Sequence, residues 1–368
     1  MVVAVCEVCE WNRQQECLCI FRWSTGKVRT ASANLARYIA MSTTSPPRNI
    51  EEELRALQPK IGAEVCRILG ALSHACAEIG DLLRTGEDGL VDAAGNANSF
   101  GDAQLRIDLL ADALIFKALK QTRCVCTASS EESASEVDIG GDPDSPFSVA
   151  FDPLDGSSVI GPNFTVGTIF GVWKGDKLRG VSGKQMVAAG MAIYGPRTVL
   201  VLSAQGCEKA GVLQYELRGA AALAGWKFLG EMAAFSDTVK LFAPANLRAA
   251  ASHPGYGSLI QFYMSEKYTL RYTGALVPDI YQLMYKKGGI YINPTSAVAP
   301  AKLRLLYEVL PIAFLIESAG GVAAGADGTN RIMDMEVTDV DVRTGACFGS
   351  RSEVERCASH LPASPNVE

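Results

Sequence analysis

Short apolar runs separated by turn residues constrain the fold of this 368-residue chain more than any other feature. The runs FSVAFDPL, TVGTIFGVWKG, TVLVLSA and GVLQYEL follow one another between residues 147 and 217 at hairpin-like spacing, which is typical of β-strands. Segments with helical periodicity precede and follow them. Runs of strands between runs of helices predict stacked sheets and helical layers, and they argue against a doubly wound parallel sheet.

Two amphipathic helices are predicted before these strands. Apolar residues recur at helical spacing in residues 51–86. Pro59 suits the first turn of this helix, and Gly86 suits its end. The second helix is predicted to begin at Asp102, placed as its N-cap, and to run through DAQLRIDLLADALIFKALKQ.

Composition excludes some classes of function. Lys and Arg total 34 against 40 Asp and Glu, and this net charge of −6 argues against a nucleic-acid-binding surface. No apolar run approaches the roughly 20 residues of a membrane-spanning helix. The eleven cysteines are scattered along a long chain, which favours a reducing compartment over a disulfide framework.

Residues 1–49 are predicted to be a variable, disordered N-terminal extension. Their cysteines also suggest a zinc site, although C-x-C is not the usual partner of C-x2-C. The acid-free part resembles an organelle transit peptide, and Met41 is an alternative start. After this extension we expect an N-terminal half at 50–235, a C-terminal half at 236–360 and a tail at 361–368.

Several acidic residues occupy places where acids are costly. Glu131 and Glu132 end a strand-like segment, Asp152 and Asp155 end a buried strand, and Glu308 lies within an apolar helix. Crowded carboxylates in a low-dielectric site repel one another, and a divalent cation removes that cost. Mg²⁺ prefers carboxylates together with phosphate oxygens, so the pattern indicates metal-assisted phosphoryl transfer.

Each motif also has a purely structural explanation, and other phosphatase chemistries have to be considered. A Glu-Glu pair is usually a solvated face, an Asp-Pro-x-Asp-Gly run is usually a turn, and Glu308 would serve as a paired core charge. The chain has only three histidines and contains no Cys-x5-Arg loop, no P-loop and no G-x-S-x-G elbow. Arg343 follows Asp-Val-Asp-Val where an aspartyl-phosphate motif needs Thr or Val.

The order of these acids resembles the lithium-sensitive, metal-dependent phosphatase superfamily. Longer stretches, among them NSFGDAQLRIDLLADALIF, FDPLDGSS and KLRLLYEVLPIAFLIESAGG, resemble the fructose-1,6-bisphosphatase class, and most closely its sedoheptulose-1,7-bisphosphatases. The resemblance implies an α/β fold of five layers, α-β-α-β-α. It also implies hydrolysis of the 1-phosphate of sedoheptulose 1,7-bisphosphate by metal-activated water.

The resemblance assigns roles residue by residue. Two or three Mg²⁺ ions, with Mn²⁺ as a substitute, are expected on Glu131, Glu132, Asp152, the Leu154 carbonyl, Asp155 and Glu308. The residues expected to orient and deprotonate the attacking water are Asp102 and Glu132, supported by Asp108. The residues expected to bind the sugar and its two phosphates are Asp155, Gly156, Ser157, Ser158, Asn246, Arg271, Tyr272, Lys302 and Arg304.

The chain departs from fructose-bisphosphatases at two positions, where Asn293 and Ala249 replace tyrosines. Because both changes shorten the polar lining around the far phosphate, we expect them to favour the seven-carbon sugar. The Cys pair that precedes Asn-Ser-Phe-Gly-Asp in plastid relatives is absent, which argues against redox activation by that route.

Several alternatives stay open at this stage. The first is a fructose-1,6-bisphosphatase or an enzyme that accepts both sugars. The second is an inactive metal-dependent binding protein, although no acid of the set is missing. A homodimer or homotetramer is expected, in the cytoplasm or alternatively in a plastid.

Overall fold

The computed structural model describes residues 9–11, 17–19, 49–86, 92–97, 103–133, 135–206, 211–219 and 225–361. Residues Arg48–Glu368 form one compact unit, and Met1–Pro47 form another. Within Met1–Pro47, β1 (Cys9–Trp11) pairs antiparallel with β2 (Cys17–Cys19). Our other expectations for residues 1–49, and those for most of the tail, lie outside the described residues.

The predicted first helix is divided in two. α2 (Ile50–Ile61) begins at a capping box, in which the Asn49 side chain accepts a hydrogen bond from the Glu52 N–H. Gly62, with φ of 88°, ends it, and α3 (Ala63–Thr85) follows. Pro59 therefore lies in the last turn of α2 and not in a first turn, because the cap at Asn49 starts the helix earlier.

The second predicted helix also begins later than expected. α4 (Arg106–Thr122) has Leu105 as its N-cap residue, so the prediction that Asp102 caps it is wrong. The Asp108 carboxylate accepts a hydrogen bond from the Leu105 N–H at 2.8 Å and so caps the helix from within its first turn. Just before the helix, β4 (Ala103–Leu105) pairs with β3 (Ala93–Ala97).

The larger sheet has eight described strands in the order β12-β11-β10-β9-β8-β7-β5-β6. Neighbouring strands are antiparallel except β5 and β7, which run parallel. The strands are β5 (Val125–Ser130), β6 (Val137–Asp138), β7 (Phe147–Asp155), β8 (Val166–Lys174), β9 (Met186–Tyr194), β10 (Thr198–Ala204), β11 (Leu213–Leu217) and β12 (Trp226–Glu231).

The smaller sheet has five described strands in the order β14-β13-β15-β17-β16. Its central neighbours β13 and β15 run parallel, and β17 is antiparallel to both β15 and β16. The strands are β13 (Leu241–Pro244), β14 (Thr269–Leu270), β15 (Ile290–Asn293), β16 (Val322–Gly325) and β17 (Ala346–Gly349). The remaining helices and helical turns are η1 (Ser157–Val159), η2 (Gly183–Gln185), η3 (Leu247–Ala251), α5 (Pro254–Ser265), α6 (Leu276–Lys286), η4 (Leu305–Val309), α7 (Leu310–Ser318), η5 (Ile332–Asp334) and α8 (Arg351–His360).

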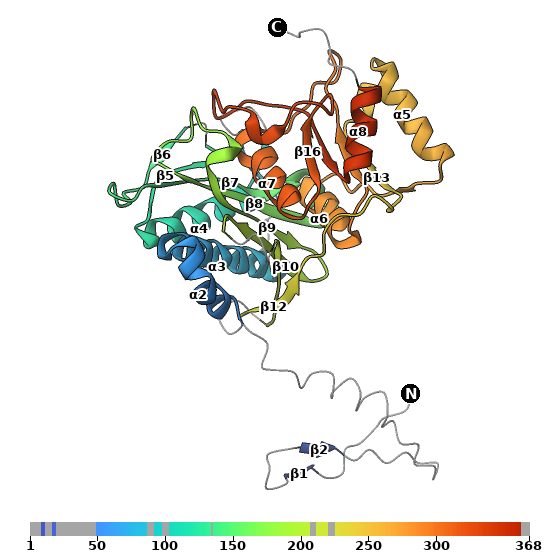
Figure 1. Cartoon of the computed structure of the whole chain (residues 1–368). Helices are drawn as coiled ribbons and strands as arrows, with labels where there is room; N and C mark the ends of the chain where they lie inside the picture. The colour runs from blue at the N-terminus through green and yellow to red at the C-terminus, as the bar shows by residue number, and fades with distance from the viewer. Residues whose placement is uncertain are drawn as a thin grey trace, which may run out of the picture. The chain divides into compact units, whose positions relative to one another are not determined.

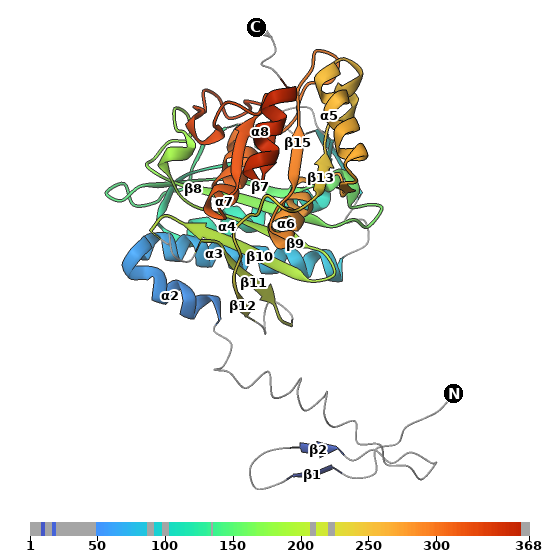
Figure 2. The ribbon, with the colours of Figure 1, turned by 45° about the vertical axis from the view of Figure 1, so that its right-hand side comes forward.

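Helices and sheets of the unit Arg48–Glu368 alternate in five layers (Figures 1 and 2). Helices α2, α3 and α4 cover one face of the larger sheet, and α6 and α7 cover the other. The smaller sheet lies beyond α6 and α7, with α5 and α8 on its far face. The predicted α-β-α-β-α architecture is confirmed.

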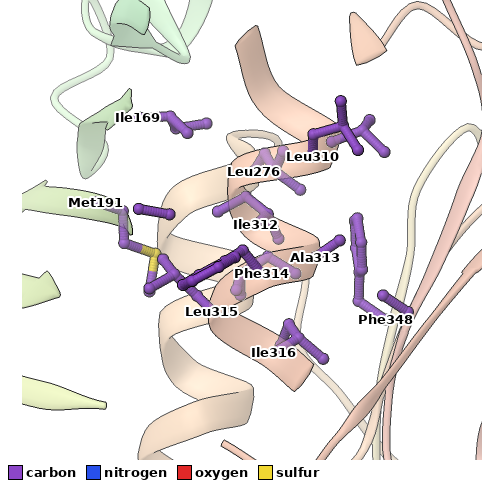
Figure 3. Close-up of a cluster of buried hydrophobic side chains, with 14 of the residues drawn as sticks. Ile169, Met191, Leu276, Leu310, Ile312, Ala313, Phe314, Leu315, Ile316 and Phe348 are labelled. Atoms are coloured by element: carbon purple, nitrogen blue, oxygen red, sulfur yellow. The ribbon is translucent and has the colours of Figure 1, made fainter. Parts of the chain in front are cut away.

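The middle layer is the apolar centre of the molecule. Every residue of α7 from Leu310 to Ile316 is buried, as expected of a helix that is covered on all sides. Its side chains contact both sheets, including Met191 of β9 on one side and Phe348 of β17 on the other (Figure 3). This packing holds the two sheets at a defined separation, so residues at their edges can face one another.

Among the described residues, none of the helices is long and apolar enough to cross a membrane. The cysteines whose side chains are described are free thiols, namely Cys66, Cys76, Cys124, Cys126, Cys347 and Cys357.

Candidate active site

The parallel pairing of β5 and β7 brings two of the predicted acids together. Glu131 follows the last residue of β5, and Asp152 lies in the second half of β7. Ser130 pairs with Phe151, and the Glu131 N–H donates a hydrogen bond to the Phe151 carbonyl at 3.0 Å. Since parallel neighbours end at the same edge of a sheet, both carboxylates reach one place.

The third acid comes from the middle layer. Glu308 lies in η4, where its carboxylate accepts a hydrogen bond from the Arg304 N–H at 2.6 Å. Carboxylate oxygens of Glu131, Asp152 and Glu308 all lie within 4.8 Å of one another. The buried Arg304 guanidinium forms an ion pair with Glu131 and a second one with Asp341 at 3.2 Å.

Burial and mutual repulsion make these carboxylates hard to ionise. Burial raises the pKa of Glu131 to about 7, although Arg304 opposes the shift. Burial, followed by the charge of Glu131, raises the pKa of Asp152 and that of Glu308 well above the usual range.

The same three acids fit a divalent cation. One Glu131 oxygen, Oε2, is buried and has no hydrogen-bond partner among the described residues. An orphaned carboxylate oxygen next to two further carboxylates is the donor set that a hard divalent metal prefers. The cluster can therefore hold a metal ion, and Glu131, Asp152 and Glu308 would be its ligands.

Asp155 serves a different contact from the three clustered acids. Its two carboxylate oxygens accept hydrogen bonds from the N–H groups of Leu276 at 3.1 Å and Val277 at 2.6 Å, at the start of α6. The turn after Asp155 lies close to the same helix, because a Cβ on Gly156 would stand 2.4 Å from that of Ala275. Asp155 thus ties the end of β7 to the middle layer, and its negative charge suits the positive N-terminus of α6.

Helix α4 carries two further acids, Asp108 and Asp112, which lie near Glu132. Burial raises the pKa of Asp108 to about 7 and that of Asp112 to about 6, and the charge of Glu132 adds to both shifts. Asp108 is 2% exposed, and its Oδ1 has no hydrogen-bond partner among the described residues. Asp102 lies outside the described residues, so its place in this group stays a prediction.

A cavity of about 310 Å³ joins the carboxylates to the smaller sheet. Among the residues expected from the sequence, those that line it are Glu131, Glu132, Asp152, Leu154, Asp155, Gly156, Ser157, Ser158, Asn246, Tyr272, Lys302, Arg304 and Glu308. Arg271 is not among the lining residues. It is exposed, and its guanidinium donates to the Leu270 carbonyl at 3.0 Å.

Two residues expected to bind the sugar or its phosphates, Asn246 and Arg304, have hydrogen-bond or ion-pair partners within the protein. The Asn246 Nδ2 donates hydrogen bonds to the carbonyls of Pro294 and Ala299, both at 2.8 Å. Those two bonds use both amide hydrogens, so this group has none left for a phosphate. Arg304 lines the cavity, but its guanidinium is paired with Glu131 and Asp341.

Sequence reasoning missed several lining residues, namely Arg248, Tyr291 and Arg343. Arg248 lies two positions after Asn246 in the stretch FAPANLRA, where a lone arginine gives no periodic or charge-pair signal. Asn293 was singled out only as a departure from relatives, and it does line the cavity. Ala249, the second departure, is fully buried in the core beneath α5 and does not line the cavity.

Two family models match successive parts of the chain. Residues 48–220 match the N-terminal domain of fructose-1-6-bisphosphatase, and residues 235–361 match its C-terminal domain. A chloroplastic sedoheptulose-1,7-bisphosphatase of Spinacia oleracea is 46% identical over 302 residues, which covers 82% of this chain and 75% of the spinach protein.

Solved structures have the same fold. A protein of Toxoplasma gondii described as a candidate sedoheptulose-1,7-bisphosphatase aligns with a TM-score of 0.77 and 33% identity, covering 87% of this chain and 99% of that one. The holo form of Leishmania major fructose-1,6-bisphosphatase aligns with a TM-score of 0.77 and 29% identity, covering 86% of this chain and 99% of that one.

Proposed function

Because the chain belongs to the fructose-1,6-bisphosphatase family, we propose that it hydrolyses the 1-phosphate of sedoheptulose 1,7-bisphosphate. The products are sedoheptulose 7-phosphate and inorganic phosphate. The observation that carries this proposal is that carboxylate oxygens of Glu131, Asp152 and Glu308 lie within 4.8 Å of one another at one end of a cavity. Lysine and arginine side chains also line this cavity. A carboxylate cluster at one end and cations at the other suit a substrate with two phosphates.

The carboxylate end of the cavity is the proposed reaction centre. Two or three Mg²⁺ ions, or Mn²⁺ ions, would neutralise the acids there and act as Lewis acids toward the phosphoryl oxygens. Glu131, Asp152 and Glu308 would hold them, with the Leu154 carbonyl and Glu132 as further ligands. Asp155 keeps its bonds to α6 and positions the turn that follows it.

The attacking group is proposed to be water, which Glu132 orients and deprotonates. Asp108 and Asp112 lie near Glu132, and the charge of Glu132 adds to the rise in the pKa of both. Asp102 is proposed to share the deprotonation. An Asp102→Ala enzyme that turns over at a near-normal rate would contradict the role of that residue.

The departing phosphate is proposed to lie on the turn after β7. Gly156 has φ of 84°, a left-handed conformation that favours glycine, and it directs Ser157 and Ser158 into the cavity wall. Their hydroxyl groups and backbone N–H groups are the donors that phosphate oxygens need. The phosphorus atom would then lie between this turn and the carboxylate cluster.

The test is release of inorganic phosphate with Mg²⁺ from sedoheptulose 1,7-bisphosphate and fructose 1,6-bisphosphate, measured side by side. We expect kcat/KM for the seven-carbon substrate to be higher by tenfold or more, or about 1.4 kcal/mol of transition-state stabilisation. Equal values would make the protein a dual-specificity sugar bisphosphatase. A complete absence of release would favour an inactive metal-dependent binding protein.

We further propose a homodimer or homotetramer, which sedimentation in solution would test. For location, the chloroplastic spinach relative favours a plastid over the cytoplasm. The absence of acids between residues 17 and 50 also suits a transit peptide. A fluorescent fusion of the whole chain is expected in plastids, and a fusion that begins at Met41 would remain in the cytosol.

A further inference from the structure

Tyr291 is the one aromatic residue of β15, and its side chain points toward the middle layer. Successive side chains of a strand point to opposite faces of the sheet. Ile290 and Ile292 accordingly pack in the apolar cluster under α5 and α8, whereas Tyr291 belongs to the cluster around α6 and α7. Its ring lies beside that of Phe348 of β17, with 6.1 Å between the ring centroids. The apolar part of Tyr291 is therefore held in the core.

The hydroxyl end of Tyr291 opens into the cavity of the candidate active site. The residue is only 3% exposed, yet it lines that cavity. Among the residues that the structure describes, the hydroxyl has no hydrogen-bond partner. A buried tyrosine hydroxyl usually finds such a partner, and phenylalanine would fill the same apolar space without needing one. The hydroxyl therefore suits a contact with a ligand better than a role in packing.

The acids near Tyr291 do not bind this hydroxyl. Asp155, Asp279 and Glu308 are close enough for their charges to act on it. Each of the three carboxylates accepts hydrogen bonds from backbone N–H groups instead. The phenol is thus left as an unused donor among carboxylates that already have other partners.

The same surroundings decide what the hydroxyl can do. Burial, followed by the nearby Tyr272 and the three carboxylates, raises the pKa of Tyr291 well above the usual range. The group therefore stays protonated at neutral pH, so it can donate a hydrogen bond but cannot serve as a general base. A phosphate placed at this hydroxyl would add negative charge beside three carboxylates, whereas a neutral hydroxyl group of a ligand would add none.

Tyr272 provides a second phenol in the same cavity. It follows β14, and β14 and β15 are the two neighbours of β13 in the smaller sheet. Tyr272 is 47% exposed and lines the cavity, in contrast to the almost fully buried Tyr291. Because Tyr272 also acts on the pKa of Tyr291, the two side chains lie near each other. They can contact neighbouring oxygens of one ligand.

We propose that the Tyr291 hydroxyl donates a hydrogen bond to a neutral hydroxyl group on the carbon chain of the sugar. This contact would hold the middle of the substrate in place and would take no part in breaking the phosphate ester. The inference rests on the proposed function, because it assumes that the ligand is a sugar phosphate. It assigns a role to a cavity residue that the sequence analysis did not single out.

Tyr291→Phe is the variant that tests the contact, since it removes the hydroxyl and keeps the ring in the core. For sedoheptulose 1,7-bisphosphate we expect KM to rise about fivefold or more with kcat changed less than about twofold, because the contact is the same in the ground state and the transition state. Tyr285→Phe removes the hydroxyl of an exposed tyrosine of α6, and as the matched control it should change neither quantity.

The stability of the ligand-free protein separates this role from a structural one. Because the hydroxyl has no partner in the protein, urea denaturation should show Tyr291→Phe to be at least as stable as the unaltered chain. A clear loss of stability together with an unchanged KM would mean that the hydroxyl serves the fold, and it would overturn the proposal.

Two further substrates locate the contact. p-Nitrophenyl phosphate has no sugar, so Tyr291→Phe and the unaltered chain should hydrolyse it equally. A loss of this activity similar to the loss with the sugar would place the effect at the reaction centre and contradict the proposal. Sedoheptulose 7-phosphate, the product, measures binding without turnover, and calorimetry should show its affinity for Tyr291→Phe reduced about fivefold or more.

The proposed function and the role of Tyr291 fail in different ways. If the unaltered chain hydrolyses sugar bisphosphates but Tyr291→Phe keeps its KM and its affinity for the product, only the role of Tyr291 is overturned. If the unaltered chain releases no phosphate from either bisphosphate, the proposed function fails. In that case weaker binding of sedoheptulose 7-phosphate to Tyr291→Phe would still support the sugar contact, and unchanged binding would overturn it as well.

Discussion

At the scale of single residues, Asp152 has unfavourable electrostatic surroundings. Glu131, Asp155 and Glu308 all disfavour its ionised form, in addition to the cost of burial. The buried cation Arg304 is paired with Glu131. Such a residue weakens the metal-free protein at neutral pH, so its presence is better explained by function than by stability.

Replacement of Asp152 by asparagine should separate these two effects. The amide keeps an oxygen that can accept the 2.9 Å hydrogen bond from the Leu154 N–H, but it carries no charge. We expect the metal-free Asp152→Asn chain to be at least as stable as the unaltered one at pH 7. Its affinity for Mn²⁺ should fall by more than the roughly 10–100-fold that loss of an outer-shell contact costs.

Chemical denaturation would measure the stability, and titration calorimetry would measure the affinity for Mn²⁺. Asp144→Asn removes an exposed aspartate from the loop before β7, and it should change neither quantity. A clear loss of stability in the metal-free Asp152→Asn chain would contradict the electrostatic argument.

At the scale of elements, the active site depends on where α6, α7 and η4 stand between the sheets. η4 carries Glu308, and the start of α6 binds Asp155. Leu276 of α6 and the residues of α7 from Leu310 to Ile316 belong to the apolar middle layer (Figure 3). The position of α7, which continues η4, is set by packing alone, because its side chains are apolar and buried. A substitution that disturbs this packing should therefore also displace the carboxylates.

Truncation of Leu315 in α7 tests this dependence. The side chain is fully buried, so we expect Leu315→Ala to lower the free energy of unfolding by about 2–5 kcal/mol. We also expect weaker Mn²⁺ binding, since η4 and its Glu308 are continuous with α7. Leu229→Ala, at a side chain of β12 that is 40% exposed, is the control and should cost less than about 1 kcal/mol. Unchanged metal affinity in a folded Leu315→Ala chain would show that η4 is placed independently of α7.

At the scale of the whole molecule, several buried acids make stability depend on pH. The pKa values of Asp108 and Glu131 are raised to about 7, and that of Asp279 to about 6, mainly by burial. The folded chain therefore binds protons more tightly than the unfolded chain, in which these acids titrate near their usual values of 3.8 and 4.5. The stabilisation is complete below about pH 4 and is lost as the pH rises through about 6 to 7.

We expect the metal-free protein to lose stability between about pH 4 and pH 7, by on the order of 1 kcal/mol for each unit by which a pKa is raised. Saturating Mg²⁺ should reduce the loss that is due to Glu131, because it favours the ionised carboxylate, and should leave the loss due to Asp279 unchanged. Urea denaturation across this range, with and without Mg²⁺, would measure the difference. Parallel curves would contradict the assignment of Glu131 as a metal ligand.

Part of this architecture could be predicted from the sequence alone, because it depends on residues close together in the chain. The apolar runs of the strands, the helical periodicity before them and the costly acids at 131, 152, 155 and 308 are all local patterns. They predicted alternating layers and an acidic site, and the layers are confirmed. Helix starts were less accurate, since the strand pair before α4 and the cap at Asn49 compete with the signals at Asp102 and Pro59.

The tertiary structure decided which residues share the cavity. Glu131 and Arg304 are 173 positions apart, and their ion pair arises because β5 and β7 end beside η4. Likewise Arg248 and Asn293 line the same cavity because β13 and β15 run parallel and Asn246 bonds to the loop after β15. Local periodicity specifies which face of an element is buried, but not which distant element covers it. The sequence alone therefore determined which acidic residues belong to the candidate site. Only the tertiary structure decided which acids the cationic side chains contact, because those contacts join residues far apart in the chain.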